Sequence, residues 1–382
     1  MLQKRVGIFL YFEWLSVSPS IISAIRLLTE NDYVVDVFCL YNDSIKIYKP
    51  ESDKVNLISV KSGKQKWLTS MQFFWASLKT VFKNKYSFFV GVDQEGIITA
   101  GFWAKIKQIP YIYYSLEIVT KEDILKEKGL RRIAIGFRRL LENFFSKRAE
   151  ITVIQDHYRA QVIIDNSNIK KERIFIVPNS YYFNLKYSCK DAAAQYPFNS
   201  GKKVVIYTGS IIPEMAIEEI IDSTNYWSDN TVLLLHAPYE TDYLQAMRGL
   251  VAKEKLEKKI VFSVGQLSFE ELCCLIRQAS IGISFYRPTS KSFALGPAGK
   301  VSFYLSQGVP IITSRVPAVL DFIEKYKCGL CIESPKYLPG AIKNILSNYS
   351  EFLSNTKLCY EEELEFPNHF KKVINKIESY GK

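Results

Sequence analysis

Histidine and cysteine are scarce in this chain and are nowhere gathered into a metal-binding set. Among the 382 residues there are three histidines, all far in sequence from the C-x-x-C pair Cys328 and Cys331. A structural zinc site needs about four ligands, so this pair alone predicts no metal centre. The seven scattered cysteines instead predict reduced, buried thiols in a cytoplasmic protein.

Long hydrophobic runs are also lacking. No segment reaches the ~18–20 apolar residues that a membrane-spanning helix requires. The run Val6–Phe12 follows two basic residues, but it is short, ends at Glu13 and lacks a small-residue cleavage site. It therefore predicts a buried first strand rather than a signal peptide. With 48% hydrophobic and 23% charged residues, the composition excludes collagen-like and largely disordered chains.

The net charge of +11 is unevenly distributed. Residues 1–190 hold 29 Lys and Arg against 18 Asp and Glu, whereas residues 191–382 hold 21 of each. The densest basic stretch is Lys126–Arg148, in which apolar residues recur at helical spacing between arginines. Such a helix either lies on an anionic membrane surface or buries its apolar stripe in the core, with its arginines in solvent. Nucleic acid is not an expected partner, because no nucleic-acid-binding motif accompanies the charge.

Apolar strands alternate with helical patterns along the whole chain, which indicates parallel sheets buried on both faces. We expect one α/β domain over residues 1–186, a linker at 187–202 and a second α/β domain at 203–364. A C-terminal helix at 365–382 is expected to pack on the first domain. Ser268 and Glu271 form a predicted capping box. The expected strands are Val6–Phe12, Val34–Leu40, Phe88–Val92, Tyr111–Tyr114, Ile151–Ile154, Val204–Tyr207, Thr231–Leu235, Lys259–Phe262, Ile281–Phe285 and Val309–Thr313.

The segment Arg287–Pro310 carries the strongest sign of a ligand site. Gly296, Pro297 and Gly299 form a turn that leads into a helix near Lys300. Free amides and the dipole at a helix start favour phosphate, and Lys300 adds a positive charge there. The spacing alone equally fits a plain strand–turn–helix with a solvated lysine.

Several segments resemble, in order, those of GT-B glycosyltransferases of the GT4-like group. The stretch GPAGKVSFYLSQGVPII resembles their donor-site motif, and VVIYTGS resembles the strand and glycine loop that open their second domain. Similar likenesses hold for IFIVPNSYY, ENFFSKRAEITVIQDHYRA and VFSVGQLSFEELCCLIRQASIGISFY. The resemblance implies a GT-B fold, in which the parallel sheets of two Rossmann-like domains face a central cleft. It also implies an acceptor site in the first domain and a nucleotide-sugar site in the second.

When the roles of the family's residues are transferred to the matching positions of this chain, the resemblance implies that Lys300 binds the diphosphate. Lys300 would stabilise the diphosphate as the leaving group. The donor would be a UDP- or GDP-linked sugar, and no metal or other cofactor would be required. His236 is added to the donor site because it ends a strand on that side. The other expected donor-site residues are Gly209, Ser210, Val264, Gly265, Arg287, Gly296, Pro297, Ala298 and Gly299.

On the acceptor side, Glu117 and Asp93 each follow a predicted strand end. Glu117 is the expected catalytic carboxylate, either as a general base or as a group that positions the acceptor. A salt-bridged surface glutamate is the alternative interpretation, and Asp93 is the weaker candidate.

The sequence departs from the family pattern at the donor site. Phe303 stands where the family has a ribose-binding glutamate, and Ser210 stands where it often has a cation. We therefore expect a donor held differently, with Arg287 or Lys291 as the substitute cation, or a reduced activity.

The expected function is transfer of a hexose to a glycan or lipid-linked glycan in bacterial cell-surface polysaccharide synthesis, at the inner face of the membrane. Two alternatives remain open. One is a nucleotide-sugar 2-epimerase of the same fold, which needs acidic and histidine groups in its cleft. The other is a non-catalytic relative that binds a glycan or a partner enzyme.

Overall fold

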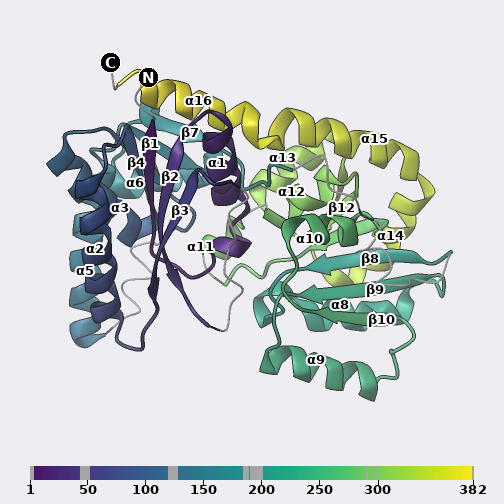
Figure 1. Ribbon diagram of the computed structural model, residues 1–382. Coiled ribbons are helices and arrows are strands. Elements are labelled where there is room, and N and C mark those ends of the chain that lie inside the picture. The colour runs from purple at the N-terminus through teal and green to yellow at the C-terminus, as the bar shows by residue number, and fades with distance from the viewer. Residues whose placement is uncertain are drawn as a thin grey trace. The chain divides into compact units, whose positions relative to one another are not determined.

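The computed structural model describes residues 4–43, 52–118, 128–183, 189, 201–289, 291–296 and 299–380. The chain divides into two compact units (Figure 1). Unit 1 comprises Met1–Pro178 and Phe366–Lys382, and unit 2 comprises Asn179–Glu365. Most of the expected linker at 187–202 lies outside the described residues.

Unit 1 is built on a parallel sheet of seven strands in the order β3-β2-β1-β4-β5-β6-β7. The winding reverses between β1 and β4, so the ligand-binding position of such a sheet lies at the carboxyl ends of these two strands. The strands are β1 (Arg5–Leu10), β2 (Val34–Tyr41), β3 (Val55–Lys61), β4 (Phe88–Val92), β5 (Tyr111–Tyr114), β6 (Ile151–Ile154) and β7 (Ile174–Ile176).

The helices of unit 1 include the last helix of the chain, α16, which packs against α1 and β7. The Glu378 carboxylate near its end accepts hydrogen bonds from Lys4 Nζ at 2.5 Å and from the Tyr33 hydroxyl. The helices are η1 (Leu15–Val17), α1 (Pro19–Glu30), α2 (Lys66–Lys83), α3 (Asp93–Lys107), α5 (Gly129–Ser146), α6 (His157–Ser167), η2 (Lys171–Arg173) and α16 (Phe366–Glu378).

Unit 2 has a parallel sheet of six strands in the order β10-β9-β8-β11-β12-β13, and its winding reverses between β8 and β11. The strands are β8 (Lys203–Thr208), β9 (Thr231–Ala237), β10 (Ile260–Val264), β11 (Ile281–Ser284), β12 (Ile311–Thr313) and β13 (Gly329–Cys331). The helices are η3 (Pro213–Met215), α8 (Ile217–Ser223), η4 (Thr224–Tyr226), α9 (Asp242–Lys253), α10 (Phe269–Ile276), α11 (Lys291–Ala294), α12 (Gly299–Ser306), α13 (Pro317–Tyr326), η5 (Pro335–Tyr337), α14 (Leu338–Ser347), α15 (Tyr349–Cys359) and η6 (Tyr360–Leu364).

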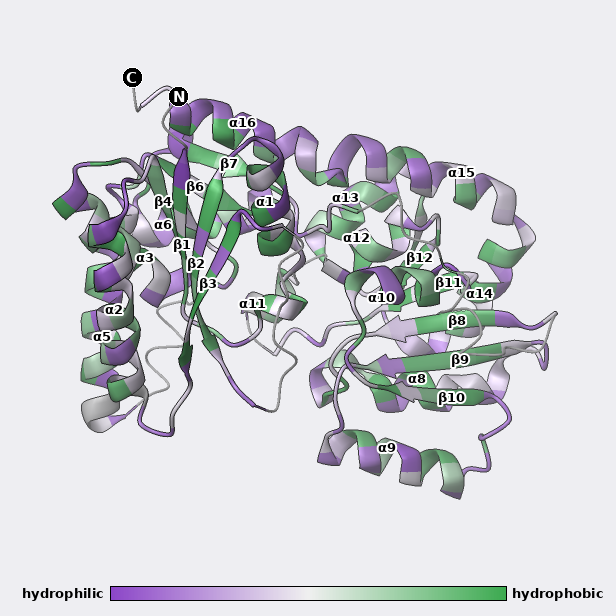
Figure 2. Ribbon diagram, in the orientation of Figure 1, coloured by the Kyte–Doolittle hydropathy of each residue, from purple (hydrophilic) through white to green (hydrophobic). Residues whose placement is uncertain are grey.

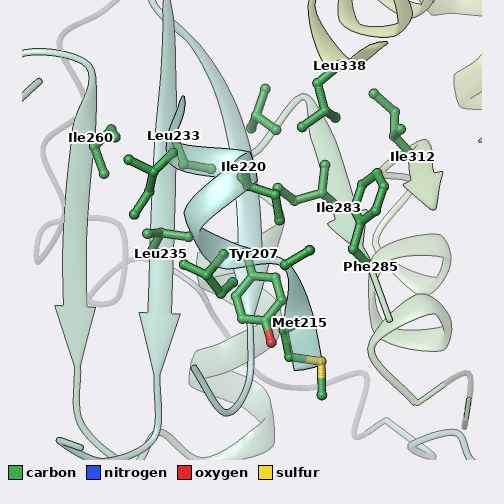
Figure 3. Close-up of a cluster of buried hydrophobic side chains, with 14 of the residues drawn as sticks. Tyr207, Met215, Ile220, Leu233, Leu235, Ile260, Ile283, Phe285, Ile312 and Leu338 are labelled. Atoms are coloured by element: carbon green, nitrogen blue, oxygen red, sulfur yellow. The ribbon is translucent and has the colours of Figure 1, made fainter. Parts of the chain in front are cut away.

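The strands of unit 2 are nearly continuous apolar runs because helices cover the sheet and bury the strand side chains. Leu233 and Leu235 of β9 and Ile283 of β11 are completely buried beneath the helices (Figure 3). Figure 2 shows the same hydrophobic character along β8 and β9. At the carboxyl end of this layer the core includes Tyr207 and Met215, which border the candidate site.

The predicted capping box is confirmed, because the side chains and amides of Ser268 and Glu271 bond reciprocally at the start of α10. The sequence analysis missed three strands. β3 is a half-buried edge strand without a continuous apolar run, and β7 and β13 have only three residues each. Such short segments carry too little periodicity to be distinguished from loops.

The prediction of seven reduced thiols is wrong for two cysteines. Cys189 and Cys274 form a disulfide, with their Cα atoms 5.3 Å apart. Their separation of 85 residues in sequence explains the error, because nothing in the local pattern indicates that the fold brings them within bonding range. Cys328 and Cys331 are free.

A close contact between Gly282 of β11 and Tyr304 of α12 fixes that helix on the sheet. A Cβ atom at position 282 would lie 2.4 Å from the Tyr304 ring. The Tyr304 hydroxyl also accepts a hydrogen bond from the Thr208 amide at 2.9 Å. Only glycine allows this approach, so the pair sets the distance between α12 and the end of β8.

We predict that Gly282→Ala lowers the free energy of unfolding by about 1–3 kcal/mol, because the added methyl group overpacks the contact with Tyr304. Chemical denaturation measures this change. The matched control is Gly340→Ala in α14, where a Cβ atom meets nothing within 4 Å. That substitution is expected to stabilise the protein by up to about 1 kcal/mol. Equal stability of the two variants would contradict the role given to this contact.

Candidate functional site

In unit 2, the side chain of Lys300 extends from α12 to the end of β8. Its ammonium donates a hydrogen bond to the Tyr207 hydroxyl at 3.1 Å and lies 3.9 Å from the sulfur of Met215. The same nitrogen lies 4.3 Å from the ring centroid of Tyr207 and 5.1 Å from that of Tyr286. Among the residues that the structure describes, no carboxylate contacts this ammonium. Aromatic faces and a hydroxyl therefore surround the cation in place of a counter-ion.

Burial lowers the pKa of Lys300 to about 7. The cause is desolvation, which penalises the charged form of a lysine wherever no anion compensates. An anion that entered beside the ammonium would raise this pKa again and would fix the positive charge.

The loop after β8 forms the facing wall of this position. Gly209 has a φ of 122°, a region open mainly to glycine, and a Cβ atom there would lie 3.7 Å from Lys300 Nζ. The next residue, Ser210, accepts a hydrogen bond through its carbonyl from Tyr207, and its hydroxyl lies 3.1 Å from that of Tyr239. The predicted neighbourhood of Gly209, Ser210 and Lys300 is thus present in the structure.

Asn179 holds the start of α12. Its carbonyl accepts a hydrogen bond from Ser302 Oγ at 3.0 Å, and its side-chain amide lies beside Gly299. Gly296 lies against the ring of Tyr286. The predicted ligand residues Pro297 and Ala298 lie outside the described residues.

Arg287 has a partner that the sequence analysis did not foresee. Its guanidinium bonds to the carboxylate of Glu219 at 2.5 Å and to the carbonyl of Pro213. The Arg287 amide also donates to the carbonyl of Glu214 at 2.7 Å. Arg287 therefore ties η3 to the segment after β11, and its role as a substitute cation for the donor stays a prediction.

His236, Val264 and Gly265 lie at the carboxyl ends of β9 and β10. Nδ1 of His236 lies 2.9 Å from the Ser263 hydroxyl, and burial lowers the pKa of this histidine to about 4. The imidazole is therefore neutral at physiological pH and links two strands. Backbone hydrogen bonds connect the loops after β8 and β10 to the end of β9. The amide of Gly209 donates to the carbonyl of His236, and the amide of Gly265 donates to the carbonyl of Ala237.

Phe303 belongs to an aromatic cluster in unit 2. It is 5% exposed, stacks on Tyr181 with ring centroids 6.1 Å apart, and contacts Phe269 at 5.4 Å. The Tyr181 hydroxyl bonds to the carboxylate of Glu270 at the start of α10. Glu270 is thus a carboxylate bonded directly to the cluster, and no sequence pattern indicated it.

In unit 1, Asp93 follows β4 with a φ of 52°, a left-handed conformation that disfavours residues other than glycine. Its Oδ1 accepts hydrogen bonds from the amides of Leu116 at 2.7 Å and Glu117 at 3.0 Å. Burial nevertheless raises the pKa of Asp93 to about 7. The negative charges of Glu117 and Glu142 also raise it, whereas the two backbone hydrogen bonds lower it. The two predicted acceptor-side residues therefore lie together, at the edge where the winding of the sheet reverses.

Glu117 itself is exposed and lines a cavity of about 10 Å³, room for about one water molecule. Two buried residues of the QDHYRA segment hold the loop that carries it. Gln155 donates to the carbonyl of Ser115 at 2.6 Å, and Arg159 donates to that of Leu116 at 2.5 Å. The sequence analysis noted this motif only as a family likeness and missed the role of Gln155 and Arg159.

No metal-binding group of three or more His, Cys, Asp or Glu side chains occurs within the described ranges. None of the helices in these ranges has the length and hydropathy of a membrane span.

Comparison with known proteins shows the GT-B glycosyltransferase fold. HepE from Anabaena, solved in complex with UDP and glucose, matches with a TM-score of 0.72 at 13% identity, over 98% of this chain and 100% of that one. WaaG, a glycosyltransferase involved in lipopolysaccharide biosynthesis, matches with a TM-score of 0.68 at 13% identity, over 98% and 99% of the two chains. The sucrose-phosphate synthase of Thermosynechococcus elongatus gives 0.71 at 14% identity, over 98% and 99%.

At the level of sequence families, residues 240–377 match the family described as glucosyltransferase 3-like, C-terminal domain. This match includes α12 and Lys300. No curated protein matches the chain.

We predict that Lys300→Met stabilises the ligand-free protein by on the order of 1–3 kcal/mol at or below about pH 7. The folded-state pKa of Lys300 is about 7, below its unfolded value of about 10.4. Between these values the unfolded chain binds the proton more tightly, so this group makes the wild type more stable as pH rises. The advantage of the variant therefore shrinks toward pH 10.

Urea denaturation of both proteins across this pH range measures the effect. Lys291→Met, which removes an exposed lysine from α11, is the control and should leave stability nearly unchanged. A Lys300→Met variant that is less stable than the wild type at every pH would contradict the uncompensated burial of this cation.

Proposed function

We propose that this protein is a glycosyltransferase that takes a sugar from a nucleotide-diphosphate sugar and binds the diphosphate at Lys300. The observation that carries the proposal is the Lys300 ammonium, which has no carboxylate partner among the described residues and lies beside Gly209 at the carboxyl edge of a parallel sheet. A helix start and a half-buried cation together favour a diphosphate. The GT-B fold and the glucosyltransferase 3-like match over residues 240–377 support the same assignment.

The proposed donor is a UDP-sugar, with UDP-glucose the first to test. The support is that HepE has been solved in complex with UDP and with UDP-glucose. In this chain Val264 and Gly265 would contact the base through their backbone, and Glu270 would replace the missing carboxylate at position 303 as the ribose partner. Hexose specificity remains part of this proposal.

In the reaction, an acceptor hydroxyl oxygen bonds to the anomeric carbon, and the bond from that carbon to the β-phosphate oxygen breaks. The nucleoside diphosphate leaves with the electron pair of the broken bond, and the hydroxyl proton passes to a carboxylate. Lys300 stabilises the charge that develops on the leaving diphosphate, a form of electrostatic catalysis that needs no further reorganisation once the donor is bound.

We assign acceptor binding to unit 1 and the proton-accepting role to Asp93 rather than to Glu117. A pKa of about 7 suits a general base at neutral pH, and Asp93 lies at the carboxyl end of β4, where the winding of the sheet reverses. The proposed acceptor is a glycan or lipid-linked glycan of a cell-surface polysaccharide. A lipid-linked acceptor would place the enzyme at the inner face of a membrane.

We predict that UDP binds to the wild type and that Lys300→Ala weakens this binding at least about tenfold. Binding should take up part of a proton near pH 7, because the diphosphate raises the pKa of Lys300. Affinity should therefore fall as pH rises above about 7. Calorimetry in two buffers of different ionisation enthalpy measures both quantities.

The control is Lys253→Ala, which removes an exposed lysine from α9 of unit 2 and should bind UDP like the wild type. GDP is titrated in parallel to determine whether the donor site prefers uracil or guanine. The proposal fails if neither nucleotide nor its sugars bind, or if Lys300→Ala binds UDP with unchanged affinity and unchanged proton uptake.

Asp93→Asn is predicted to lower the rate of UDP-sugar hydrolysis, in which water takes the place of the acceptor, by about 10²–10⁴-fold. The wild-type rate should fall as pH drops below about 7, because the base must be ionised. The variant should lose this pH dependence while its affinity for UDP stays unchanged. Glu117→Gln is the matched comparison, and a loss confined to that variant would return the role to Glu117.

A further inference from the structure

The helix α5 exposes the face that a water-soluble helix normally buries. Ile133, Phe137 and Leu140 are 70%, 60% and 68% exposed, and Phe144 follows at 41%. Their spacing of four, three and four residues places them on one stripe of the helix. The alternative in which this stripe enters the core is therefore excluded.

Polar contacts hold the opposite side of α5 toward α3 and the sheet. Arg138 bonds to Glu95 of α3 at 3.2 Å, and within α5 Arg139 bonds to the buried Glu142 at 2.8 Å. Glu142 also accepts hydrogen bonds from the Tyr113 hydroxyl and from Gln94, both at 2.8 Å. These charged groups of α5 have their partners on the side of the helix that faces α3 and the sheet. The apolar stripe therefore lies on the outer side of the helix.

The apolar surface continues onto the neighbouring helices. α5 packs on α3, and α3 packs on α2. On α2, Trp67 and Trp75 are 61% and 58% exposed, on the side opposite the buried Phe73. Phe102 of α3 is 40% exposed and joins the two helices, because its ring lies 5.1 Å from that of Phe74. We call this surface, formed by the outer sides of α2, α3 and α5, the three-helix face; its helices carry both hydrophobic and hydrophilic bands (Figure 2).

Basic side chains are interspersed with these apolar groups. Lys107 Nζ lies 5.0 Å from the ring centroid of Phe82, and the Arg148 guanidinium lies 3.7 Å from that of Phe144. Lys79, Lys83 and Lys105 are exposed on α2 and α3. The first half of the chain also carries all of the excess positive charge, with 29 basic and 18 acidic residues up to position 190.

We propose that the three-helix face is a membrane-docking surface that lies on an anionic lipid bilayer. Tryptophan and phenylalanine among lysines and arginines are the groups that settle at the boundary between acyl chains and headgroups. The lysines would meet anionic headgroups, whereas the core of a protein–protein interface is depleted in lysine. The charge therefore favours a lipid surface over a second copy of the chain. This inference stands independently of the donor site.

The test is flotation of the purified full-length chain with two kinds of vesicle, phosphatidylcholine alone and phosphatidylcholine mixed with phosphatidylglycerol. Binding is expected to the anionic vesicles and to weaken at high salt. Trp75→Ser/Phe137→Ser should lower partitioning by about tenfold or more, since two interfacial aromatic groups are lost. The control Leu353→Ser/Leu358→Ser removes two exposed apolar residues from α15 of unit 2 and should bind like the wild type.

A second pair of variants tests the charge. Lys79→Glu/Lys83→Glu should abolish most binding to anionic vesicles, whereas Lys253→Glu/Lys258→Glu, which reverses two exposed charges in unit 2, should reduce it far less. Thermal unfolding of every variant, compared with the wild type, separates lost docking from lost folding. Equal effects of the two charge pairs would show nonspecific attraction and overturn the proposal.

Sedimentation velocity tests the alternative that a second copy of the chain covers the three-helix face. A vesicle-independent dimer that Trp75→Ser/Phe137→Ser dissociates, without binding of the wild type to either kind of vesicle, would assign the three-helix face to a second copy and reject the membrane. If the wild type remains monomeric and binds neither kind of vesicle, the membrane-docking proposal is rejected as well.

Discussion

The ring of Tyr304 lies against the bare backbone of Gly282, and the placement of Lys300 depends on this contact. Tyr304 and Lys300 are one turn apart on α12, so fixing the tyrosine on β11 also fixes where the lysine reaches. The hydroxyl of the same tyrosine bonds to Thr208 at the end of β8, next to Gly209. A helix of eight residues would be poorly positioned by its own hydrogen bonds alone. The core of unit 2 therefore determines the geometry of the site through one ring.

In each unit, a poorly compensated ionisable group lies at the carboxyl edge of the sheet, next to the candidate site. In unit 2 it is Lys300, whose pKa burial lowers to about 7, and in unit 1 it is Asp93, whose pKa burial raises to about 7. Both shifts mean that the folded protein disfavours the charged form. Stability alone would favour a neutral residue at either position, and this agrees with the functional roles that we propose for the two groups.

The sequence was informative where a pattern is local. Continuous apolar runs identified the central strands, and the spacing of Ser268 and Glu271 identified a helix start. It was uninformative where an outcome depends on a distant partner. The guanidinium of Arg287 is neutralised by Glu219, 68 residues away, and no local pattern shows this pairing. Phe303 likewise joins an aromatic cluster that includes Tyr181, 122 residues earlier in the sequence.

The orientation of α5 shows the same limit most clearly. Its periodicity predicts an amphipathic helix, but period alone leaves undecided which face is turned to the sheet. The orientation follows from Glu95 of α3, which pairs with Arg138. It follows also from the buried Glu142 of α5 itself, which accepts hydrogen bonds from Tyr113 and Gln94. Turning α5 over would take Glu142 away from Tyr113 and Gln94, which leaves a buried charge without partners and costs more than exposing one more apolar side chain. The helix therefore keeps its ion pairs inside and presents Ile133, Phe137 and Leu140 outward, where a lipid surface can bury them.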